Sequence, residues 1–333
     1  MKGPSNRLRK WLVTGAAGFI GSHLVENLLR RGESVVGFDN LSTGKLSNLN
    51  EVKTHAGEER WSRFEWVQGD IEDLPAVTRA AEDCHVILHE AALGSVPLSL
   101  ERPLQTHATN VTGFVHVLEA ARAHKIPRVV YASSSAVYGD CPDLPLGEQS
   151  AGAVLSPYAA SKLVDEICAR SYAASYGMEL VGLRYFNVFG PRQDPNGPYA
   201  AVIPKWIHAI LSGEQVPING TGENTRDFCY VEDVVRANLL AATAPLDPGT
   251  SLALNVGGGR STSLNELFEI LAKLAARYSP ANIPARPTFG PARPGDILHS
   301  TADVGAAAEA LGFRAECPLE DSFRTTFEWF AKC

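Results

Sequence analysis

The residues best suited to chemistry in this chain are a tyrosine and a lysine in SPYAASKLVDE, residues 156–166. Tyr158 and Lys162 are four positions apart, so on a helix their side chains are neighbours on one face. An ammonium group beside a phenol favours the phenolate and makes the tyrosine a usable acid/base near neutral pH. The same spacing also occurs on inert helix surfaces, so the rest of the sequence must distinguish the two interpretations.

A run of serines, Ser133 to Ser135, follows the apolar stretch RVVYA. Ligands of open α/β sheets bind at the carboxyl ends of the strands, so these hydroxyl groups could belong to a site. Serine runs are also common in loops, and taken alone this run favours a loop.

Three glycines follow the first predicted strand in TGAAGFIGSHL. Gly15, Gly18 and Gly21 are three apart, a spacing that permits a tight turn and brings a pyrophosphate close to backbone N–H groups at a helix N-terminus. Asp39 ends the second predicted strand, where a carboxylate would bind an adenosine ribose. A carboxylate there repels a 2′-phosphate and favours NAD over NADP, a preference that Lys45 slightly tempers.

Short apolar runs alternate with helical patterns through the first half of the chain. Strands are predicted at residues 11–14, 34–38, 64–68, 85–89, 128–132 and 180–185, and helices near 20–31, 104–124 and 158–176. Alternation on this scale predicts an α/β protein with a Rossmann-type doubly wound parallel sheet. By their position after the third and fourth strands, Asp70 and Ile71 are expected beside the adenine, and Ala91 and Ala92 beside the cofactor.

The composition of the sequence changes after residue 186, where proline and glycine become frequent. We therefore predict a Rossmann domain over residues 1–186, with a return of the chain near 228–260, and a smaller mixed substrate domain over 187–333. The strand LALNV, residues 252–256, is expected to rejoin the sheet or its edge.

Composition excludes several classes of protein. The 333 residues are 45% hydrophobic and 20% charged with a net charge of −7, which gives no basic surface for nucleic acid or an anionic membrane. The six cysteines form no CxxC pair and no metal-ligand pattern, so we expect reduced thiols and no metal site. Glycines, His23 and Glu26 interrupt the apolar stretch near the start, which is too short to span a membrane, so we expect a cytoplasmic protein.

The glycine motif GxxGxxG, the aspartate after the second strand, SSSAVYG, YAASK and LRYFNVFGPRQ occur in this order between residue 11 and about residue 305. Together they resemble the extended short-chain dehydrogenase/reductase family and, within it, the nucleotide-sugar 4-epimerases. The resemblance implies that Ser134, Tyr158 and Lys162 are catalytic. Tyr158, aided by Ser134, would take the proton from a sugar C4 hydroxyl while NAD accepts the hydride, and Lys162 would bind the nicotinamide ribose. The hydride would then return to the opposite face of the 4-keto sugar, without net oxidation.

The resemblance also adds cofactor contacts. Besides the glycines, Asp39, Asp70, Ile71, Ala91, Ala92, Tyr158 and Lys162, it assigns NAD contacts to Phe19, Ile20, Asn40, Ser42, Gly44, Asn110, Tyr185 and Val188.

Residues after the catalytic serine distinguish the possible reactions. Related dehydratases carry an acidic pair there and related decarboxylases a nearby glutamate, whereas this chain has Ser135 and Ala136. An elimination would lack its acid and its base, and epimerisation needs neither.

The substrate implied by the resemblance is a UDP-sugar. Asn187, Arg226, Arg293 and Asp296 match the positions that bind the nucleotide, and two arginines suit a diphosphate. Ser300 occupies the position where a tyrosine confines related enzymes to plain hexoses, so we expect room for an N-acetyl group. The remaining predicted sugar contacts are Gly94, Ser95, Ser134, Ser135, Tyr158, Gln193 and Val202. We therefore expect interconversion of UDP-GlcNAc and UDP-GalNAc, with some activity on UDP-Glc and UDP-Gal, as in enzymes of polysaccharide synthesis.

Alternatives are an epimerase of a UDP-hexuronate such as UDP-GlcNAcA or UDP-GlcA, a net NAD-dependent oxidoreductase, and a non-catalytic NAD-binding protein. Relatives pair two helices into a dimer, and the stretches 104–124 and 158–176 carry Val115, Leu118, Ala169 and Tyr172. A homodimer is expected from the resemblance, although an ordinary core face explains the same periodicity.

Overall fold

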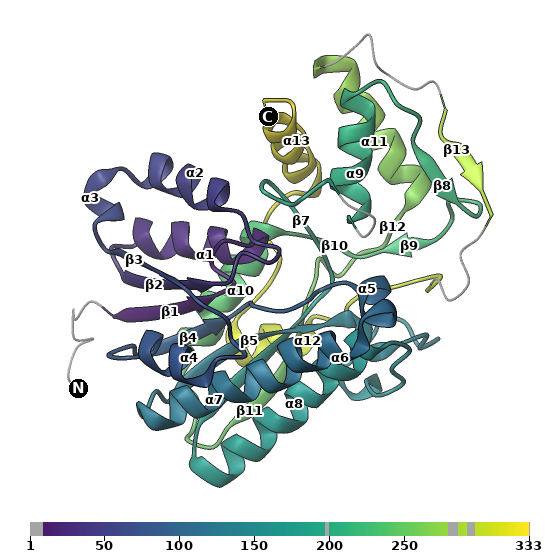
Figure 1. Ribbon diagram of the computed structural model, residues 1–333. Coiled ribbons are helices and arrows are strands. Elements are labelled where there is room, and N and C mark those ends of the chain that lie inside the picture. Colours follow the sequence, from purple (N-terminus) through teal and green to yellow (C-terminus); the bar gives the residue numbers. More distant parts are fainter. Residues whose placement is uncertain (1–8, 197–199, 279–285, 292–296, 333) are drawn as a thin grey trace. The chain divides into compact units, whose positions relative to one another are not determined.

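The computed structural model describes residues 9–196, 200–278, 286–291 and 297–332. The chain forms two compact units, coloured by sequence in Figure 1. Unit 1 comprises Met1–Ser134, Ser156–Arg184 and Val235–Leu254, and unit 2 comprises Ser135–Leu155, Tyr185–Val234 and Asn255–Cys333. Each unit has its own hydrophobic core.

A seven-stranded sheet forms the centre of unit 1. Its strands are β1 (Lys10–Thr14), β2 (Ser34–Asp39), β3 (Phe64–Gln68), β4 (Val86–His89), β5 (Arg128–Ser134), β6 (Glu179–Tyr185) and β11 (Ser251–Val256). They lie in the order β11-β6-β5-β4-β1-β2-β3, and the β2–β3, β1–β2, β1–β4 and β4–β5 pairs are parallel. The predicted Rossmann-type sheet and the expected return of residues 252–256 to its edge are confirmed.

Strand order reverses at β1, which lies between β2 and β4. The chain leaves β1 toward β2 on one side and leaves β4 toward β5 on the other, so the connections after β1 and β4 run in opposite directions. Ligands of doubly wound sheets bind in the crevice at such a point. The residues that follow Thr14 and His89 are therefore candidates for a ligand-binding site.

Helices cover both faces of this sheet: α4, α7 and α8 lie on one face, and α1 and α10 on the other (Figure 1). The helices of unit 1 are α1 (Phe19–Arg30), α2 (Leu46–Ala56), α3 (Glu58–Trp61), α4 (Leu74–Ala80), α5 (Val96–Glu101), α6 (Pro103–His107), α7 (Gly113–Ala123), α8 (Pro157–Tyr176) and most of α10 (Val231–Thr243). Leu118 and Ala169 are fully buried in the core beneath α7 and α8, so for these two residues the apolar pattern reflects an ordinary core face rather than a dimer surface.

Residues 104–124, expected to form one helix, are divided by a π-helical turn at Ala108–Thr112 between α6 and α7. A π-turn contains an extra residue per turn and is frequent at functional sites. Apolar periodicity does not reveal it, because the flanking segments keep their α-helical period.

Helix α8 begins where its sequence requires. The Ser156 side chain accepts a hydrogen bond from the Ala159 N–H at 3.1 Å, and Pro157 occupies the first helical turn, where its missing N–H costs nothing. The helix ends at Gly177, which takes the left-handed conformation at φ 71°. Tyr158 therefore lies in the first turn of α8 and Lys162 in the second.

Unit 2 consists of short strand pairs and helices. The pairs β7 (Asn187–Phe189) with β10 (Phe228–Tyr230) and β8 (Pro217–Asn219) with β13 (Thr288–Gly290) are parallel, whereas β9 (Thr225–Arg226) with β12 (Thr262–Ser263) is antiparallel. Its helices are α9 (Val202–Leu211), α11 (Leu264–Tyr278), α12 (Gly305–Leu311) and α13 (Leu319–Phe330), with 3₁₀ turns at Ser135–Tyr138 and Glu148–Ser150. Phe189, Phe228 and Phe323 pack together in the core, with 4.6 Å between the rings of Phe189 and Phe323.

None of the helices in the described ranges combines the length and the apolar character that crossing a bilayer requires.

A buried ion pair holds α8 against the sheet. The Arg184 guanidinium on β6 donates from Nε and Nη2 to the two carboxylate oxygens of Glu166, each at 2.8 Å. The Ser133 hydroxyl on β5 donates to the same carboxylate at 2.6 Å, and Arg184 and Glu166 are 5% and 4% exposed. This two-point contact fixes the helix that carries Tyr158 and Lys162 to the two strands beside it.

We predict that Glu166→Gln lowers the free energy of unfolding by about 3 kcal/mol, because it leaves the buried Arg184 charge without its carboxylate. Chemical denaturation measures this change. The matched control is Asp321→Asn, which breaks the solvent-exposed Arg324–Asp321 pair and should change stability by less than about 0.5 kcal/mol. Equal effects of the two substitutions would contradict a stabilising role for Glu166.

Candidate active site

The loop between β1 and α1 is shaped by glycine. Gly15 has φ +70°, and a Cβ on it would come within 2.7 Å of the Ala91 backbone nitrogen. A Cβ on Gly21 would lie 2.0 Å from the Gly15 carbonyl oxygen. Gly18 caps α1 without any side chain, so backbone N–H groups at the helix start face the loop. This is the geometry that a helix N-terminus needs to bind a phosphate.

Asp39 is held by the backbone around this loop. Its Oδ2 accepts from the Ala17 N–H at 3.0 Å and its Oδ1 from the Leu41 N–H at 2.7 Å. Burial raises the pKa of Asp39, and these backbone hydrogen bonds oppose that increase. The carboxylate at the end of β2 is thus fixed in place, as binding of a ribose would require.

Two further predicted residues meet beside Asp39. The Asn40 side chain donates to Asp70 at 2.8 Å, which joins the loops after β2 and β3. Gly44 lies close behind the aspartate, since a Cβ there would be 2.8 Å from Asp39 Oδ2.

A pocket of about 70 Å³ collects many of the predicted cofactor residues in unit 1. It is lined by the predicted residues Gly15, Gly18, Asp39, Asn40, Ser42, Ile71, Ala91 and Ala92. It also contains Phe38, Thr43, Gly69, Glu90, Leu93 and Thr109, which the sequence analysis missed although most adjoin predicted residues in the chain. Gly21, Phe19 and Ile20 lie in the first turn of α1 and are not among the lining residues. Its lining includes residues that follow β1 and β4, the two strands at the reversal of strand order.

The catalytic candidates also belong to unit 1. Ser134 ends β5 and is 9% exposed, and α8 packs directly on β5. Tyr158 is half-buried, whereas Lys162 is 2% exposed and lies with its Nζ 3.4 Å from Asp165 Oδ2. The structure therefore carries a phenol and a buried ammonium on successive turns of one helix.

Asn110 lies in the π-helical turn and is completely buried. Its Oδ1 accepts from the Leu93 N–H at 2.8 Å, and its Nδ2 donates to the Leu93 carbonyl at 3.2 Å and to the Ser161 hydroxyl at 2.9 Å. Ser161 in turn donates to the Tyr158 carbonyl at 2.8 Å. Both amide hydrogens of Asn110 are thus used to connect the loop after β4 with the first turn of α8, so a direct contact with the cofactor would have to replace one of these bonds.

His89 is a buried residue of the site that the sequence analysis did not identify. It ends β4, and its Nδ1 lies 2.8 Å from the Thr14 hydroxyl. Burial, together with the charge of Lys162, lowers the pKa of His89 to about 3, so the imidazole is neutral at physiological pH. It contributes no second cation beside Lys162. The sequence did indicate that His89 lies at the end of a predicted strand, where ligands of parallel sheets bind.

Unit 2 contains a separate pocket of about 420 Å³. Asn187, Gln193, Val202 and Arg226, all predicted to bind substrate, line it, as does Val188, which was assigned to the cofactor. The sequence analysis missed the other lining residues, Ala200, Ala201, Ile203, Lys205, Trp206, Pro217, Asn219, Phe228 and Leu264. Lys205 is an exposed second cation here, beside the half-buried Arg226.

Asp227, next to Arg226, organises this part of unit 2. Its buried carboxylate accepts from the N–H groups of Gly258 at 2.7 Å, Gly259 at 3.0 Å and Ala302 at 3.0 Å. The segment that includes Ser300 is therefore tied to the strand that carries Arg226. Ser300 itself is 7% exposed and is not among the lining residues of the pocket.

The remaining predicted residues are placed as follows. Ser95 caps α5 by accepting from Leu98 N–H at 3.1 Å, and Gly94 before it is exposed. Ser135 and Tyr185 belong to unit 2. Arg293 and Asp296 lie outside the described residues.

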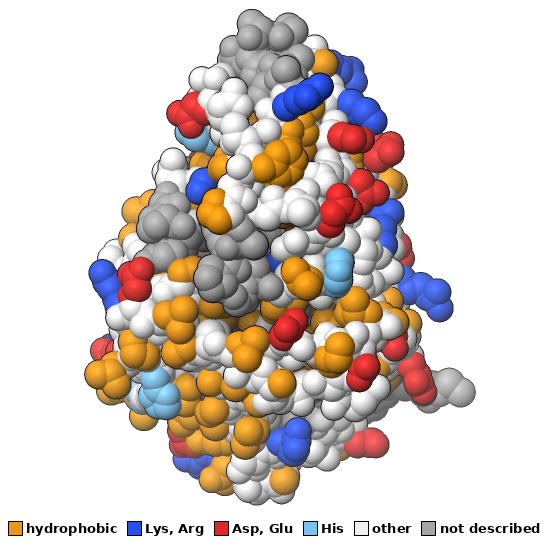
Figure 2. Space-filling model, turned by 90° about the vertical axis from the view of Figure 1, so that its right-hand side faces the viewer, with side chains coloured by type: hydrophobic (Ala, Val, Ile, Leu, Met, Phe, Trp, Pro, Cys, Tyr) orange, Lys and Arg blue, Asp and Glu red, His pale blue; other side chains and the backbone are white. Residues whose placement is uncertain are grey.

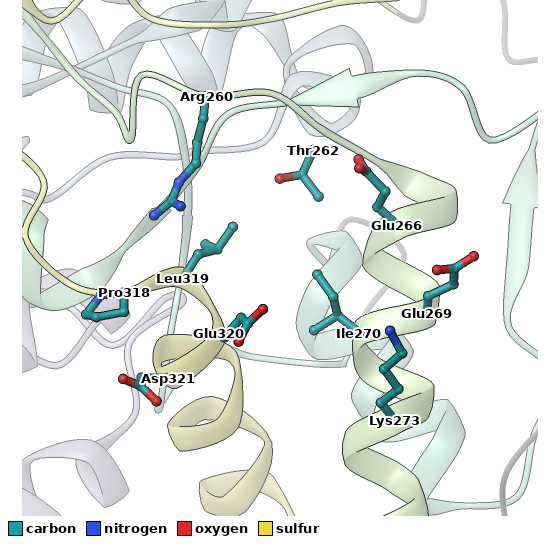
Figure 3. A pocket seen from close by; sticks show the side chains of 10 residues that line it. All are labelled: Arg260, Thr262, Glu266, Glu269, Ile270, Lys273, Pro318, Leu319, Glu320 and Asp321. Carbon is teal, nitrogen blue, oxygen red and sulfur yellow. The ribbon is translucent and has the colours of Figure 1, made fainter.

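A third cleft, of about 560 Å³, contains no predicted site residue (Figure 3). It lies between α11 and the start of α13 in unit 2, and its lining carries charges of both signs. Glu266, Glu269 and Lys273 come from α11, Glu320 and Asp321 from the start of α13, and Arg260 from the segment before β12. This mixture resembles ordinary solvated surface.

Comparison with known proteins finds similar chains over almost the whole length of this one. A UDP-glucose 4-epimerase of Mycolicibacterium smegmatis is 39% identical over 321 residues, covering 96% of this chain and 97% of that protein. A UDP-glucuronate 4-epimerase of Thermodesulfobacterium geofontis is 33% identical over 331 residues, covering 96% and 95% of the two chains. The structure of a UDP-N-acetylglucosamine 4-epimerase from Methanobrevibacter ruminantium, in complex with UDP-N-acetylmuramic acid, superposes with a TM-score of 0.88 at 38% identity over 98% of this chain and 99% of that one.

The profile of the NAD dependent epimerase/dehydratase family matches residues 11–257, about three quarters of the chain. The resemblance to nucleotide-sugar 4-epimerases, drawn from the motifs, is confirmed at the level of the family. With its glycine-rich loop, fixed aspartate and Tyr–Lys helix, this chain belongs to the NAD dependent epimerase/dehydratase family.

Proposed function

We propose that this enzyme interconverts UDP-N-acetylglucosamine and UDP-N-acetylgalactosamine by epimerisation at C4, and that it also acts on UDP-Glc and UDP-Gal. The observation that carries the reaction type is the placement of Tyr158 and the buried Lys162 on successive turns of α8, which packs on the strand that ends in Ser134. A half-buried phenol beside an ammonium can take a proton from a sugar hydroxyl and give it back.

The residues of unit 1 fit NAD. A Cβ at Gly15 or Gly21 would collide with backbone at 2.7 or 2.0 Å, so the loop keeps the close backbone approach that a pyrophosphate needs. Asp39, with both oxygens oriented by backbone N–H groups, suits two ribose hydroxyls and disfavours a 2′-phosphate. Lys162 would hold the nicotinamide ribose. When bound, NAD supplies the capacity to accept a hydride from C4 and to return it.

Each protein group then has a defined task. Tyr158 removes the proton of the C4 hydroxyl and later restores it, and Ser134 orients that oxygen by a hydrogen bond. Lys162 stabilises the phenolate form of Tyr158 through its charge. Asn187, Gln193 and Arg226 in the pocket of unit 2 would bind the nucleotide sugar, with the Arg226 guanidinium on the diphosphate.

The N-acetyl preference rests on Ser300 and on the similarity to the M. ruminantium UDP-N-acetylglucosamine 4-epimerase. A small side chain at this position leaves room for an acetamide, whereas added room rejects a smaller sugar only weakly.

A UDP-hexuronate is the second candidate substrate, because Lys205 adds a cation to the pocket of unit 2 and a UDP-glucuronate 4-epimerase is 33% identical to this chain. Incubating the protein separately with UDP-GlcNAc, UDP-Glc and UDP-GlcNAcA and identifying the products by NMR distinguishes the candidates. Conversion of UDP-GlcNAcA alone would overturn the N-acetylhexosamine assignment. Stoichiometric release of NADH would instead indicate a net oxidoreductase.

We also propose a homodimer formed through unit 1. Leu100 on α5, Leu104 on α6 and Ile167 on α8 are 63%, 86% and 55% exposed, although large apolar side chains are normally covered. In Figure 2, hydrophobic side chains gather in the lower part of the displayed face.

The five described cysteines are free thiols, which fits the cytoplasmic setting that we propose.

The glycine loop between β1 and α1 gives a prediction about NAD binding. Gly21→Ala should weaken NAD binding by roughly tenfold or more, since the new methyl group displaces the Gly15 carbonyl and distorts the loop. Isothermal titration calorimetry measures the affinity. Gly290→Ala is the control, because its methyl group would meet only ordinary contacts from 3.7 Å. An unaltered affinity of the Gly21 variant for NAD would exclude this loop from the cofactor site.

Tyr158→Phe should lower kcat by roughly a hundredfold or more, because it removes only the ionisable hydroxyl. Binding of NAD should persist, as calorimetry can establish. Turnover equal to that of the unaltered enzyme would remove Tyr158 from the mechanism and with it the proposed function.

Ser300→Tyr should lower kcat/KM for UDP-GlcNAc by roughly a hundredfold while sparing UDP-Gal, because the aromatic ring would fill the space for the acetamide. The matched control is Ser300→Ala, which removes the hydroxyl without adding volume and should retain both activities. Thermal unfolding of each variant separates a specificity effect from misfolding. A parallel loss on both substrates in a folded variant would contradict the placement of Ser300 beside the sugar.

A further inference from the structure

Lys162 has a buried carboxylate as its neighbour in the C-terminal direction along α8, whereas Tyr158 precedes it by one turn. Asp165 follows it by three positions on α8, and the two side chains are 2% and 1% exposed, with 3.4 Å between Lys162 Nζ and Asp165 Oδ2. A charge-assisted N–H···O bond is ordinarily 2.7–2.9 Å long, so this contact is loose. The other carboxylate oxygen, Oδ1, has no hydrogen-bond donor among the described residues.

A buried carboxylate with one loose partner gains protons easily. Desolvation penalises the charged form, and Lys162 offsets this penalty only partly. Burial raises the pKa of Asp165 to about 7, with Glu166 adding to the increase and Lys162 opposing it. Above this pH the carboxylate and the ammonium form an ion pair, and below it Asp165 is a neutral acid.

Three other titratable groups near Asp165, namely Cys168, Tyr131 and His89, stay neutral in this range. Burial raises the pKa of Cys168 on the same helix and holds the pKa of Tyr131 on β5 well above its ordinary value. His89 on β4 stays neutral, because burial lowers its pKa to about 3. Glu166 is already bound by Arg184 on β6 and by Ser133.

The titratable groups on the helices packed against α8 either bind other partners or are exposed to solvent. Glu119 on α7 binds Arg122 and Tyr172, and Glu101 on α5 and His107 on α6 are exposed. Among the groups named here, Asp165 is the one whose pKa burial raises to about 7.

We propose that Asp165 is a positioning residue that acts through Lys162: its carboxylate holds the ammonium in place and charged beside Tyr158, and its protonation releases that hold. The inference rests on the proposed roles of Tyr158 and Lys162. As the pH falls, Asp165 takes up one proton, the Lys162 ammonium loses its counter-ion, and the group that stabilises the phenolate is no longer fixed. Turnover then falls as the pH falls through the titration of Asp165.

The pH profile of kcat tests this proposal. In the wild type, kcat should decrease toward acid pH with a midpoint near the Asp165 titration, with little change in KM. Asp165→Asn should be roughly tenfold slower at alkaline pH, the size expected for loss of a charge-assisted contact, and should lack that acid limb. Asp165→Glu should restore an acid limb with a displaced midpoint. A purely structural role would lower kcat at every pH and leave the limb in place, which would overturn the proposal.

Infrared difference spectroscopy of the holoenzyme gives a readout that does not depend on turnover. Acidification of the wild type should produce the C=O stretch of a protonated buried carboxyl group, and this band should be missing in Asp165→Asn and displaced in Asp165→Glu. If Asp165→Asn does not fold, the band in the wild type and its displacement in Asp165→Glu still show whether Asp165 takes up the proton. No band in the wild type would overturn the proposal even if Tyr158→Phe is inactive, so this inference and the proposed function can fail separately.

Glu119→Gln is the matched control. Glu119 also forms an acid–base pair at a spacing of three with Arg122, but it contacts α8 at Tyr172, fourteen residues or about 21 Å along the helix from Tyr158. Its variant should keep the acid limb and the infrared band. Loss of either in this control would show that any removal of negative charge suffices, and would overturn the specific role of Asp165.

Discussion

The two-point ion pair between Arg184 and Glu166 is the constraint on which the arrangement of helix α8 depends. Ionised side chains leave water at a large cost, and this cost is recovered only when geometry and hydrogen bonding are nearly complete. Here both carboxylate oxygens are occupied, and a hydroxyl from the neighbouring strand adds a third bond. The same helix presents a second, loosely bound acid to the lysine. One face of α8 thus combines a fully satisfied acid that fixes position with an incompletely satisfied one that responds to protons.

Much of unit 1 could be predicted from the sequence. All six strands expected in the first half are present, because parallel strands buried on both faces appear as uninterrupted apolar runs. Gly15, Asp39 and Ala91 gather in one pocket because strand ends of a parallel sheet share an edge. Local spacing also predicted that Tyr158 and Lys162 lie one turn apart on a helix, and α8 confirms this placement.

Residues that act through packing could not be predicted in this way. The environments of His89 and Asp165, and the hydrogen bonds that Asn110 makes, depend on burial or on partners far away in the chain. A lone histidine at a strand end or an aspartate after a lysine has many explanations until the environment is known. In unit 2, short strands and irregular connections give no strong period, so the pocket residues Trp206, Asn219 and Leu264 were missed. Asp227 was overlooked although it follows a predicted arginine, because its partners are backbone amides.

The π-helical turn at Ala108–Thr112 bears on how this protein could be altered. An extra residue in one turn shifts the phase of every side chain beyond it by about 100° relative to an unbroken α-helix. Core residues of α7, such as Phe114 and Leu118, are therefore in register with the sheet only while that residue is retained. Removing it would produce a more regular helix by local rules, yet it would turn either the core face of α7 or the Asn110 amide away from its partners. The π-helical turn is disfavoured by local energetics, yet it lets α7 pack on the sheet while Asn110 stays bonded to Ser161 on α8.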